Sequence, residues 1–209
     1  IALFFVTPLV LTSWLFNVTQ DPFLFNLTAG LIRLGIFLGY LTAIAQLKDV
    51  KRLFMYHGAE HKTVFAYEKE RVLDAAAASR HSRFHPRCGT SFLLVVMLVA
   101  IVLFAMLDTV LVGVLGRITL PIRLVAHLLL LPVVGGASYE VIRFAARHAG
   151  TLWGRIAVAP GLWLQRITTS EPDGSQLEVA VAALCAALGQ DAPLAASPEA
   201  APMQRAAAN

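Results

Sequence analysis

The run from His57 to His61, which reads His-Gly-Ala-Glu-His, holds the residue types best suited to chemistry in this chain. Two imidazoles four residues apart on a helix point the same way, and the carboxylate of Glu60 stands beside one of them. This layout is H-x-x-E-H, the inverted form of the zinc-hydrolase motif. It predicts a centre for zinc or another divalent metal, with His57 and His61 as ligands and Glu60 as the general base that deprotonates water.

The motif lies on a predicted helix from about Asp49 to Arg71. One stripe of this helix, at steps of three and four residues, consists of Val50, Phe54, His57, His61, Val64 and Glu68. The stripe predicts that both imidazoles share an apolar, partly buried face. Imidazoles on consecutive turns can reach one ion without straining the backbone.

Such a metal needs further protein ligands, and the chain offers three candidates. Hydrolases with this motif use a downstream glutamate, for which Glu140 is the candidate. His85 and Cys88, which come shortly before a long apolar segment, are the others. A shell of four protein ligands that includes Cys88 would be closed and structural. A shell of His57, His61, Glu140 and a water molecule would be open and catalytic.

A plainer interpretation of the same residues stays open. The two histidines could be packed core residues whose hydrogen bonds are satisfied. Glu60 could form an ion pair with Lys62 or Arg52 on a solvated face. For Cys88, a small residue in a tight Pro/Gly loop is favoured over a nucleophilic thiolate.

The composition favours a membrane protein. The 209 residues are 57% hydrophobic and 14% charged, whereas a soluble domain has about 25% charged residues. The net charge of +4 indicates attraction to anionic lipid and not sequence-specific binding of nucleic acid. Two cysteines provide no disulfide framework. We therefore expect an all-α polytopic membrane protein.

Four membrane spans are predicted, at about residues 1–16, 23–46, 91–115 and 118–138. Each of the last three has roughly the 20 residues that a bilayer crossing needs. The first is short and begins with Ile1 instead of Met, so we expect that an upstream segment has been lost. The last two spans form a helical hairpin around Gly116.

The segment 47–90 is a predicted helical loop that contains nine of the seventeen Lys and Arg residues. The positive-inside rule places this loop in the cytoplasm, and the Arg residues after the last span place the C-terminus there too. Residues 139–189 are expected to form interfacial and C-terminal helices, the first being a continuation of the last span. A capping box from Ser175 to Glu178 opens an amphipathic helix over 176–188, which Gly189 ends.

Residues 1–189 are accordingly predicted to be one membrane-embedded domain, and 190–209 a disordered tail. Four ionisable groups fall inside predicted spans: Arg33, Asp108, Arg123 and His127. Such groups need partners or water in a bilayer. Asp108 and Arg123 face each other across the hairpin, which favours an ion pair. Two interpretations of these four residues stay open. They could line a polar cavity or substrate route, or they could form a structural pair that fixes the register of the helices.

Several motifs together resemble the YqhQ-like family, which consists of bacterial multi-pass membrane proteins of unassigned function described as predicted metal-dependent enzymes. The resemblance runs from about Phe23 to Leu188. Its motifs are His57–Lys62, His85–Phe92, Ser138–Glu140 and Pro160–Gln165. It implies a location in the bacterial inner membrane and supports the choice of metal ligands above. The family tends to have Arg and Asp where this chain has Ser170 and Gly174, so an ionic role of that segment is not implied.

Two functional hypotheses lead. The first is a metal-dependent hydrolase of a peptide or lipid-linked bond at the cytoplasmic face. The second is a non-catalytic factor for membrane-protein insertion or assembly, whose basic loop and amphipathic helix dock on lipid, other membrane proteins, a ribosome or a translocation channel. A transporter that uses the intramembrane polar groups is disfavoured, because no inverted repeat is visible.

Overall fold

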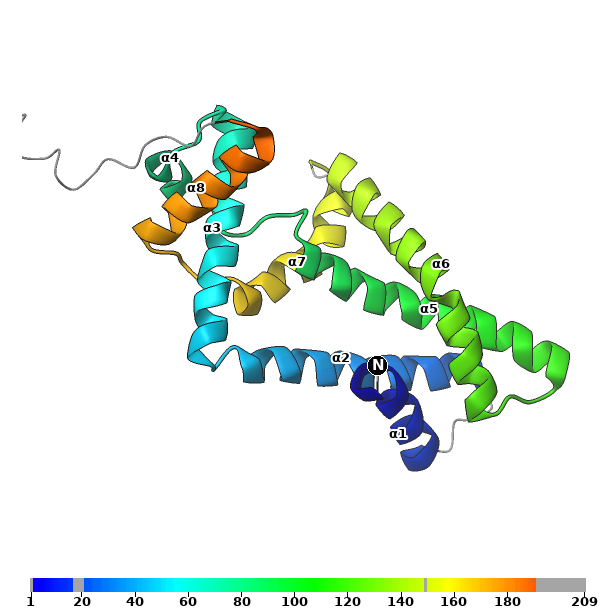
Figure 1. Ribbon diagram of the computed structural model, residues 1–209. Coiled ribbons are helices and arrows are strands. Elements are labelled where there is room, and N and C mark those ends of the chain that lie inside the picture. Colours follow the sequence, from blue (N-terminus) through cyan, green and yellow to red (C-terminus); the bar gives the residue numbers. More distant parts are fainter. Residues whose placement is uncertain (1, 17–20, 149, 191–209) are drawn as a thin grey trace, which may run out of the picture. The chain divides into compact units, whose positions relative to one another are not determined.

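The computed structural model describes residues 2–16, 21–148 and 150–190, and its regular elements in these ranges are all helices (Figure 1). The predicted all-α class is confirmed. The chain divides into two compact units. Unit 1 comprises Ile1–Lys48 and Pro86–Thr168, and unit 2 comprises Asp49–His85 and Thr169–Asn209. The single membrane-embedded domain over 1–189 stays a prediction.

Unit 1 is built around one central helix. Its elements are η1 (Ala2–Val6), α1 (Thr7–Leu15), α2 (Pro22–Ile44), α5 (Gly89–Leu115), α6 (Leu120–Arg147) and α7 (Leu152–Thr168). Helix α5 packs against α2, α6 and α7. Glycines allow the close contacts of α5 with α2 and with α7. A Cβ on Gly30 of α2 would overlap the side chain of Ile101. A Cβ on Gly161 of α7 would lie 2.5 Å from Cβ of Ser91. Gln165 of α7 also donates a hydrogen bond to the Ser91 hydroxyl over 2.9 Å.

The ends of these helices follow from local residue chemistry. The carboxylate of Asp21 accepts a hydrogen bond from the backbone N–H of Leu24 over 2.9 Å, and Pro22 occupies the first turn of α2. Helix α5 ends at Gly116, whose φ of 75° suits a residue without Cβ. The short connection to α6 makes α5 and α6 a helical hairpin (Figure 1), as predicted.

Three helices of the described chain are long and apolar enough to cross a membrane: α2, α5 and α6. They match the predicted spans at 23–46, 91–115 and 118–138, and α6 continues as one helix to Arg147. The apolar N-terminal segment Ala2–Leu15 is shorter than these three. The predicted count of four spans is therefore not confirmed.

The outside of the α5–α6 hairpin is largely apolar, and polar groups lie in the interior of unit 1. Large apolar side chains such as Leu129 (76% exposed), Val110 and Val102 lie on the outside of the hairpin, whereas Asp108 is 0% exposed. A soluble bundle would show the reverse, because water solvates polar groups and excludes apolar ones. This distribution is typical of a helical membrane protein.

Unit 2 has a core of small side chains. Helix α3 (Lys48–Glu70) matches the predicted helix within one residue, and it is joined by α4 (Ala75–Ser79) and α8 (Gly174–Leu188) (Figure 1). Helices α4 and α8 contact each other. The core residues are Ala59, Ala66, Ala77, Ala78, Leu177 and Ala180. Small side chains let α4 and α8 approach closely.

The stripe of α3 was predicted to be partly buried, and this is confirmed for all of it except Glu68. His61 is buried, Val50, Phe54, His57 and Val64 are half-buried, and Glu68 is exposed. The fully buried positions of α3 are Gly58, Ala59, His61, Lys62, Thr63 and Ala66. The small residues among them let neighbouring elements approach this side of the helix.

One such neighbour is the segment before α8. The backbone N–H of Ser170 donates to the carbonyl of Phe54 over 2.8 Å, and a Cβ on Gly58 would overlap the carbonyl oxygen of Ser170. Gly58 of the His-Gly-Ala-Glu-His run is therefore required by a close backbone contact. Helix geometry alone would not demand a glycine there.

The capping box of α8 begins at Asp173 and not at Ser175, so that prediction is wrong. The Asp173 carboxylate accepts from the Gln176 N–H, and Gln176 Oε1 accepts from the Asp173 N–H, both over 2.9 Å. An Asp with Gln three residues later provides the same reciprocal bonds as Ser with Glu. Gly189 ends the helix in the left-handed region with φ of 66°, as predicted. The predicted tail from residue 191 onward lies outside the described residues.

The Gly58 contact can be tested by substitution. We expect Gly58→Ala to lower the stability of the protein by about 1–3 kcal/mol, because a backbone carbonyl must move to admit the methyl group. Gly174→Ala is the matched control, since a Cβ at Gly174 meets nothing within 4 Å. Thermal unfolding in detergent measures both. A Gly58→Ala protein as stable as the control would contradict the close contact.

The cap of α8 predicts a response to acid. Hydrogen bonds from the Ser175 hydroxyl and the Gln176 N–H hold the pKa of Asp173 below its ordinary value of 3.8. A lowered pKa means that the cap stabilises α8 fully above this ordinary value, and that the stabilisation is lost as the pH falls through the lowered pKa.

We expect hydrogen exchange of the α8 amides, normalised to the intrinsic rate, to lose protection as the pH falls below about 4 and through the lowered pKa of Asp173. The control is Asp173→Asn, since asparagine caps a helix without titrating in this range. Equal acid responses of the two proteins would rule out Asp173 as the titrating group.

Candidate metal centre and buried charge cluster

The imidazoles of His57 and His61 converge in unit 2. Their ring centroids lie 4.4 Å apart with an interplanar angle of 65°. A ring nitrogen of His57 and a ring nitrogen of His61 lie within 4.8 Å of one another. His61 is buried and His57 is half-buried. The predicted convergence of these two rings is confirmed.

The ring of His61 is held by the backbone of the segment that follows α4. Its Nδ1 lies 2.5 Å from the carbonyl oxygen of Arg83. Because a carbonyl oxygen only accepts, Nδ1 carries the proton, and Nε2 of a neutral ring then has the lone pair. The Arg83 side chain is itself anchored, since it donates to the backbone carbonyl and the hydroxyl of Thr169.

A third imidazole lies near this pair within unit 2. The ring of His85 is 5.6 Å from that of His61 and 4.5 Å from that of Phe65, and His85 is 5% exposed. Its Nε2 lies 3.5 Å from a carboxylate oxygen of Glu68. His81 lies beside Glu70 instead, with Nε2 2.9 Å from the carboxylate. The structure thus adds His85 to the histidine pair.

Glu60 is exposed on α3. The proposed ion pair with Lys62 does not form, because the Lys62 ammonium contacts Glu171 over 3.0 Å and donates to the carbonyl of Ser79. Among the described residues no ion pair involves Glu60, so its carboxylate faces solvent. The sequence alone does not connect Glu171 or Arg83 with this region, because both come from segments that are distant from His57 and His61 along the chain.

The other predicted ligands belong to unit 1. Cys88 is buried directly before α5, with Sγ 3.1 Å from the Thr90 hydroxyl. Glu140 is exposed on α6 and pairs with Arg143 over 3.2 Å. Their roles as ligands stay predictions.

Unit 1 contains a separate buried cluster around Asp108. This carboxylate accepts hydrogen bonds from Asn26 Nδ2 over 2.8 Å, from Arg123 Nε over 2.9 Å and from His127 Nε2 over 2.9 Å. All four residues are at most 2% exposed. The predicted ion pair of Asp108 with Arg123 is confirmed. The contributions of Asn26 and His127 could not be predicted, since they depend on how three helices are rotated against one another.

Aromatic rings enclose the same cluster. The His127 ring stacks on Phe104 with centroids 4.0 Å apart and planes 3° apart, and the Arg123 guanidinium lies 3.5 Å from the centroid of Phe25. Arg33 lies near the ring of Phe104 and donates to the carbonyl of Phe4 over 2.9 Å. These contacts tie α2, α5 and α6 together. They favour a role in holding the helices in register over a substrate route.

The cluster predicts a large effect of removing its acceptor. Asp108→Leu leaves the buried Arg123 without its counter-charge, so we expect a loss of about 3–5 kcal/mol in stability. Asp108→Leu/Arg123→Leu removes both charges and should lose clearly less. Denaturation in bicelles measures both variants. If Asp108→Leu were more stable than Asp108→Leu/Arg123→Leu, the buried charge of Arg123 would not be the cause of the loss.

Comparison with known proteins places the chain in a family. A family model described as "Protein of unknown function (DUF1385)" matches residues 1–190. The "Uncharacterized protein YqhQ" of Bacillus subtilis (strain 168) is 34% identical over 152 residues, which cover 73% of this chain and 45% of that protein. The chain thus spans less than half the length of this relative. No solved structure matches. The chain belongs to the DUF1385 family, as the resemblance to the YqhQ-like proteins implied.

Proposed function

We propose that this helical membrane protein is a metal-dependent hydrolase whose centre is held by His57 and His61. The observation that carries the proposal is the convergence of the two rings, with one nitrogen of each within 4.8 Å of the other. Zn–N bonds of about 2.0–2.1 Å in tetrahedral geometry require nitrogens about 3.3 Å apart. Small side-chain rotations would reach this separation.

The hydrogen bond of His61 supports the same proposal. Histidine ligands usually donate their second ring N–H to a carbonyl or carboxylate, which fixes the tautomer and the orientation of the ring. The carbonyl of Arg83 does this for Nδ1 of His61. Nε2 is then the ligating atom. This donor set suits zinc or a similar divalent ion.

For the third ligand we propose His85, whose ring centroid lies 5.6 Å from that of His61. Cys88 follows His85 by three residues, a length of chain that extends at most about 11 Å. It is therefore the proposed fourth donor, and its thiolate would favour zinc. Glu140 remains the alternative ligand for an open, catalytic centre.

Glu60 is the proposed general base. Its carboxylate is exposed and makes no ion pair within the described chain, because Lys62 contacts Glu171. A bound metal would supply Lewis-acid activation of water, and Glu60 would accept the proton. By the positive-inside rule the centre is proposed to lie at the cytoplasmic face of the bacterial inner membrane. A peptide or lipid-linked bond at that face is the proposed substrate.

A second proposal, a factor for membrane-protein insertion or assembly, is favoured by a different observation. Lys48, Lys51 and Arg52 are all exposed at the start of α3. Such a basic patch suits anionic lipid, a ribosome or a translocation channel. Charge reversal at these three residues should impair this function more than any histidine substitution.

Metal content tests the centre. Protein purified without chelator should hold about one zinc or other divalent ion per chain, and His57→Ala/His61→Ala should hold almost none. The matched control is His148→Ala, which removes an exposed imidazole whose ring lies against Phe144 at the end of α6. Elemental analysis measures all three proteins. A wild-type protein without metal would overturn the proposal.

Glu60→Gln separates catalysis from metal binding. The variant should retain metal and thermal stability but lose hydrolysis of peptide or lipid-linked substrates by about 10²- to 10⁴-fold, because glutamine cannot accept the proton. Retention of full turnover in Glu60→Gln would exclude the general-base role while leaving the metal centre intact.

A further inference from the structure

Unit 1 has a basic pocket where α6 ends and α5 begins. Its volume is about 530 Å³, and Arg87, Tyr139, Ile142, Arg143 and Arg147 line it. The lining residues of α6 are spaced by three and four, so they form one face of that helix. Three guanidinium groups around one pocket favour an anion, and guanidinium matches phosphate with paired hydrogen bonds.

A groove with an almost wholly apolar lining runs between α5, α6 and α7. Its volume is about 420 Å³, and its lining includes Val99, Val102, Val141, Ile156 and Pro160. Helices α5 and α6 are both long and apolar enough to cross a membrane. A groove of this kind between membrane helices is suited to a hydrocarbon chain.

The pocket and the groove lie next to each other. A cleft of only about 10 Å³ lies between them, and it shares Ile142 and Pro86 with the basic pocket, and Val95, Val141 and Ala157 with the groove. Val141 and Ile142 are neighbours on α6, and they face the groove and the pocket respectively. One molecule with an anionic head and an apolar chain could therefore occupy both spaces at once.

We propose that unit 1 binds an anionic phospholipid, with its phosphate against Arg143 and Arg147 and one acyl chain in the groove. A free phosphate would leave the groove empty. A neutral lipid would not balance the positive charge of the arginine side chains. Arg143 also pairs with Glu140 over 3.2 Å. A guanidinium has five N–H donors, so others remain for phosphate. This site does not depend on the proposed metal centre.

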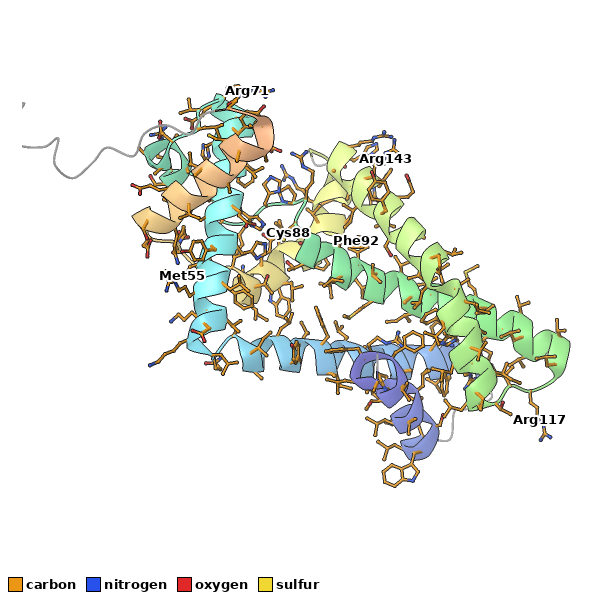
Figure 2. The ribbon with its side chains drawn as sticks, in the orientation of Figure 1. Met55, Arg71, Cys88, Phe92, Arg117 and Arg143 are labelled. Carbon is orange, nitrogen blue, oxygen red and sulfur yellow. The ribbon has the colours of Figure 1, made fainter. Side chains whose placement is uncertain are left out.

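The experiment compares lipid binding by the purified full chain in detergent, using native mass spectrometry. The probes are dioleoyl phosphatidylglycerol, which is anionic, and dioleoyl phosphatidylcholine, which carries no net charge. The test variant is Arg143→Gln/Arg147→Gln. Its matched control is Arg117→Gln/Arg166→Gln, because these two exposed arginines do not line the pocket. Figure 2 shows Arg143 near the end of α6 and Arg117 at the turn of the hairpin.

We expect the wild type to bind phosphatidylglycerol at least about tenfold more tightly than phosphatidylcholine. Each lost arginine should weaken phosphatidylglycerol binding by about fivefold, and therefore by about 25-fold in the test variant. The control should stay within about twofold of the wild type. Equal affinity for the two lipids, or equal affinity of test variant and control, would overturn the proposal.

A second variant tests the acyl groove. Ala157→Leu fills part of the groove and should weaken binding of dioleoyl phosphatidylglycerol, whereas binding of the short-chain dihexanoyl lipid should not change. Circular dichroism verifies that the variant folds. Should it misfold, Ile156→Ala serves instead, since it removes apolar contact with the chain. Equal loss for both chain lengths, or binding of inorganic phosphate as tight as that of the dioleoyl lipid, would show an anion site without an acyl groove and contradict the proposal.

Discussion

The fold of unit 1 depends on the carboxylate of Asp108, which is fully removed from solvent and bonded to donors from two other helices. A buried carboxylate is strongly destabilising unless nearby donors replace its hydration. Asn26 on α2 and both Arg123 and His127 on α6 provide that replacement. The rotation of α2 and α6 against α5 is restricted, because any other rotation would remove a donor. The apolar outer faces of the same helices are then left for lipid.

Unit 2 depends on a different constraint, the close approach of backbone to backbone at Gly58. Ser170 bonds to α3 at this point, and the adjacent Thr169 accepts hydrogen bonds from Arg83. The Arg83 carbonyl in turn holds the His61 ring. The orientation of a candidate ligand is therefore linked to the position of a distant segment. A larger residue at position 58 would disturb this arrangement without touching a histidine.

The proposed metal centre and the proposed lipid site use different chemistry. Imidazoles of unit 2, their hydrogen bonds and the exposed carboxylate of Glu60 support the metal centre. Arginines and an apolar groove of unit 1 support the lipid site. A phospholipid bound in unit 1 is compatible with a hydrolase and equally with an assembly factor, since both would act at the membrane.

Much of the helical framework could be predicted from the sequence. Helix periodicity placed the rings of His57 and His61 together, because residues four apart lie on one face of any α-helix. The lengths of the apolar runs located α2, α5 and α6, and the short hairpin brought Asp108 opposite Arg123. All of these follow from local geometry. The wrong prediction of the α8 cap also had a local cause. Asp173, and not Ser175, accepts the capping hydrogen bond at the start of this helix.

The sequence by itself thus determined the membrane class, three helices of spanning length and the convergence of one histidine pair. Only the tertiary structure decided that His127 and Asn26 join Asp108, that a carbonyl from Arg83 holds His61, and that Arg143 faces a pocket next to an apolar groove. The physical reason is that periodicity fixes angles within one helix, whereas the rotation of a helix against its neighbours depends on packing along its whole length.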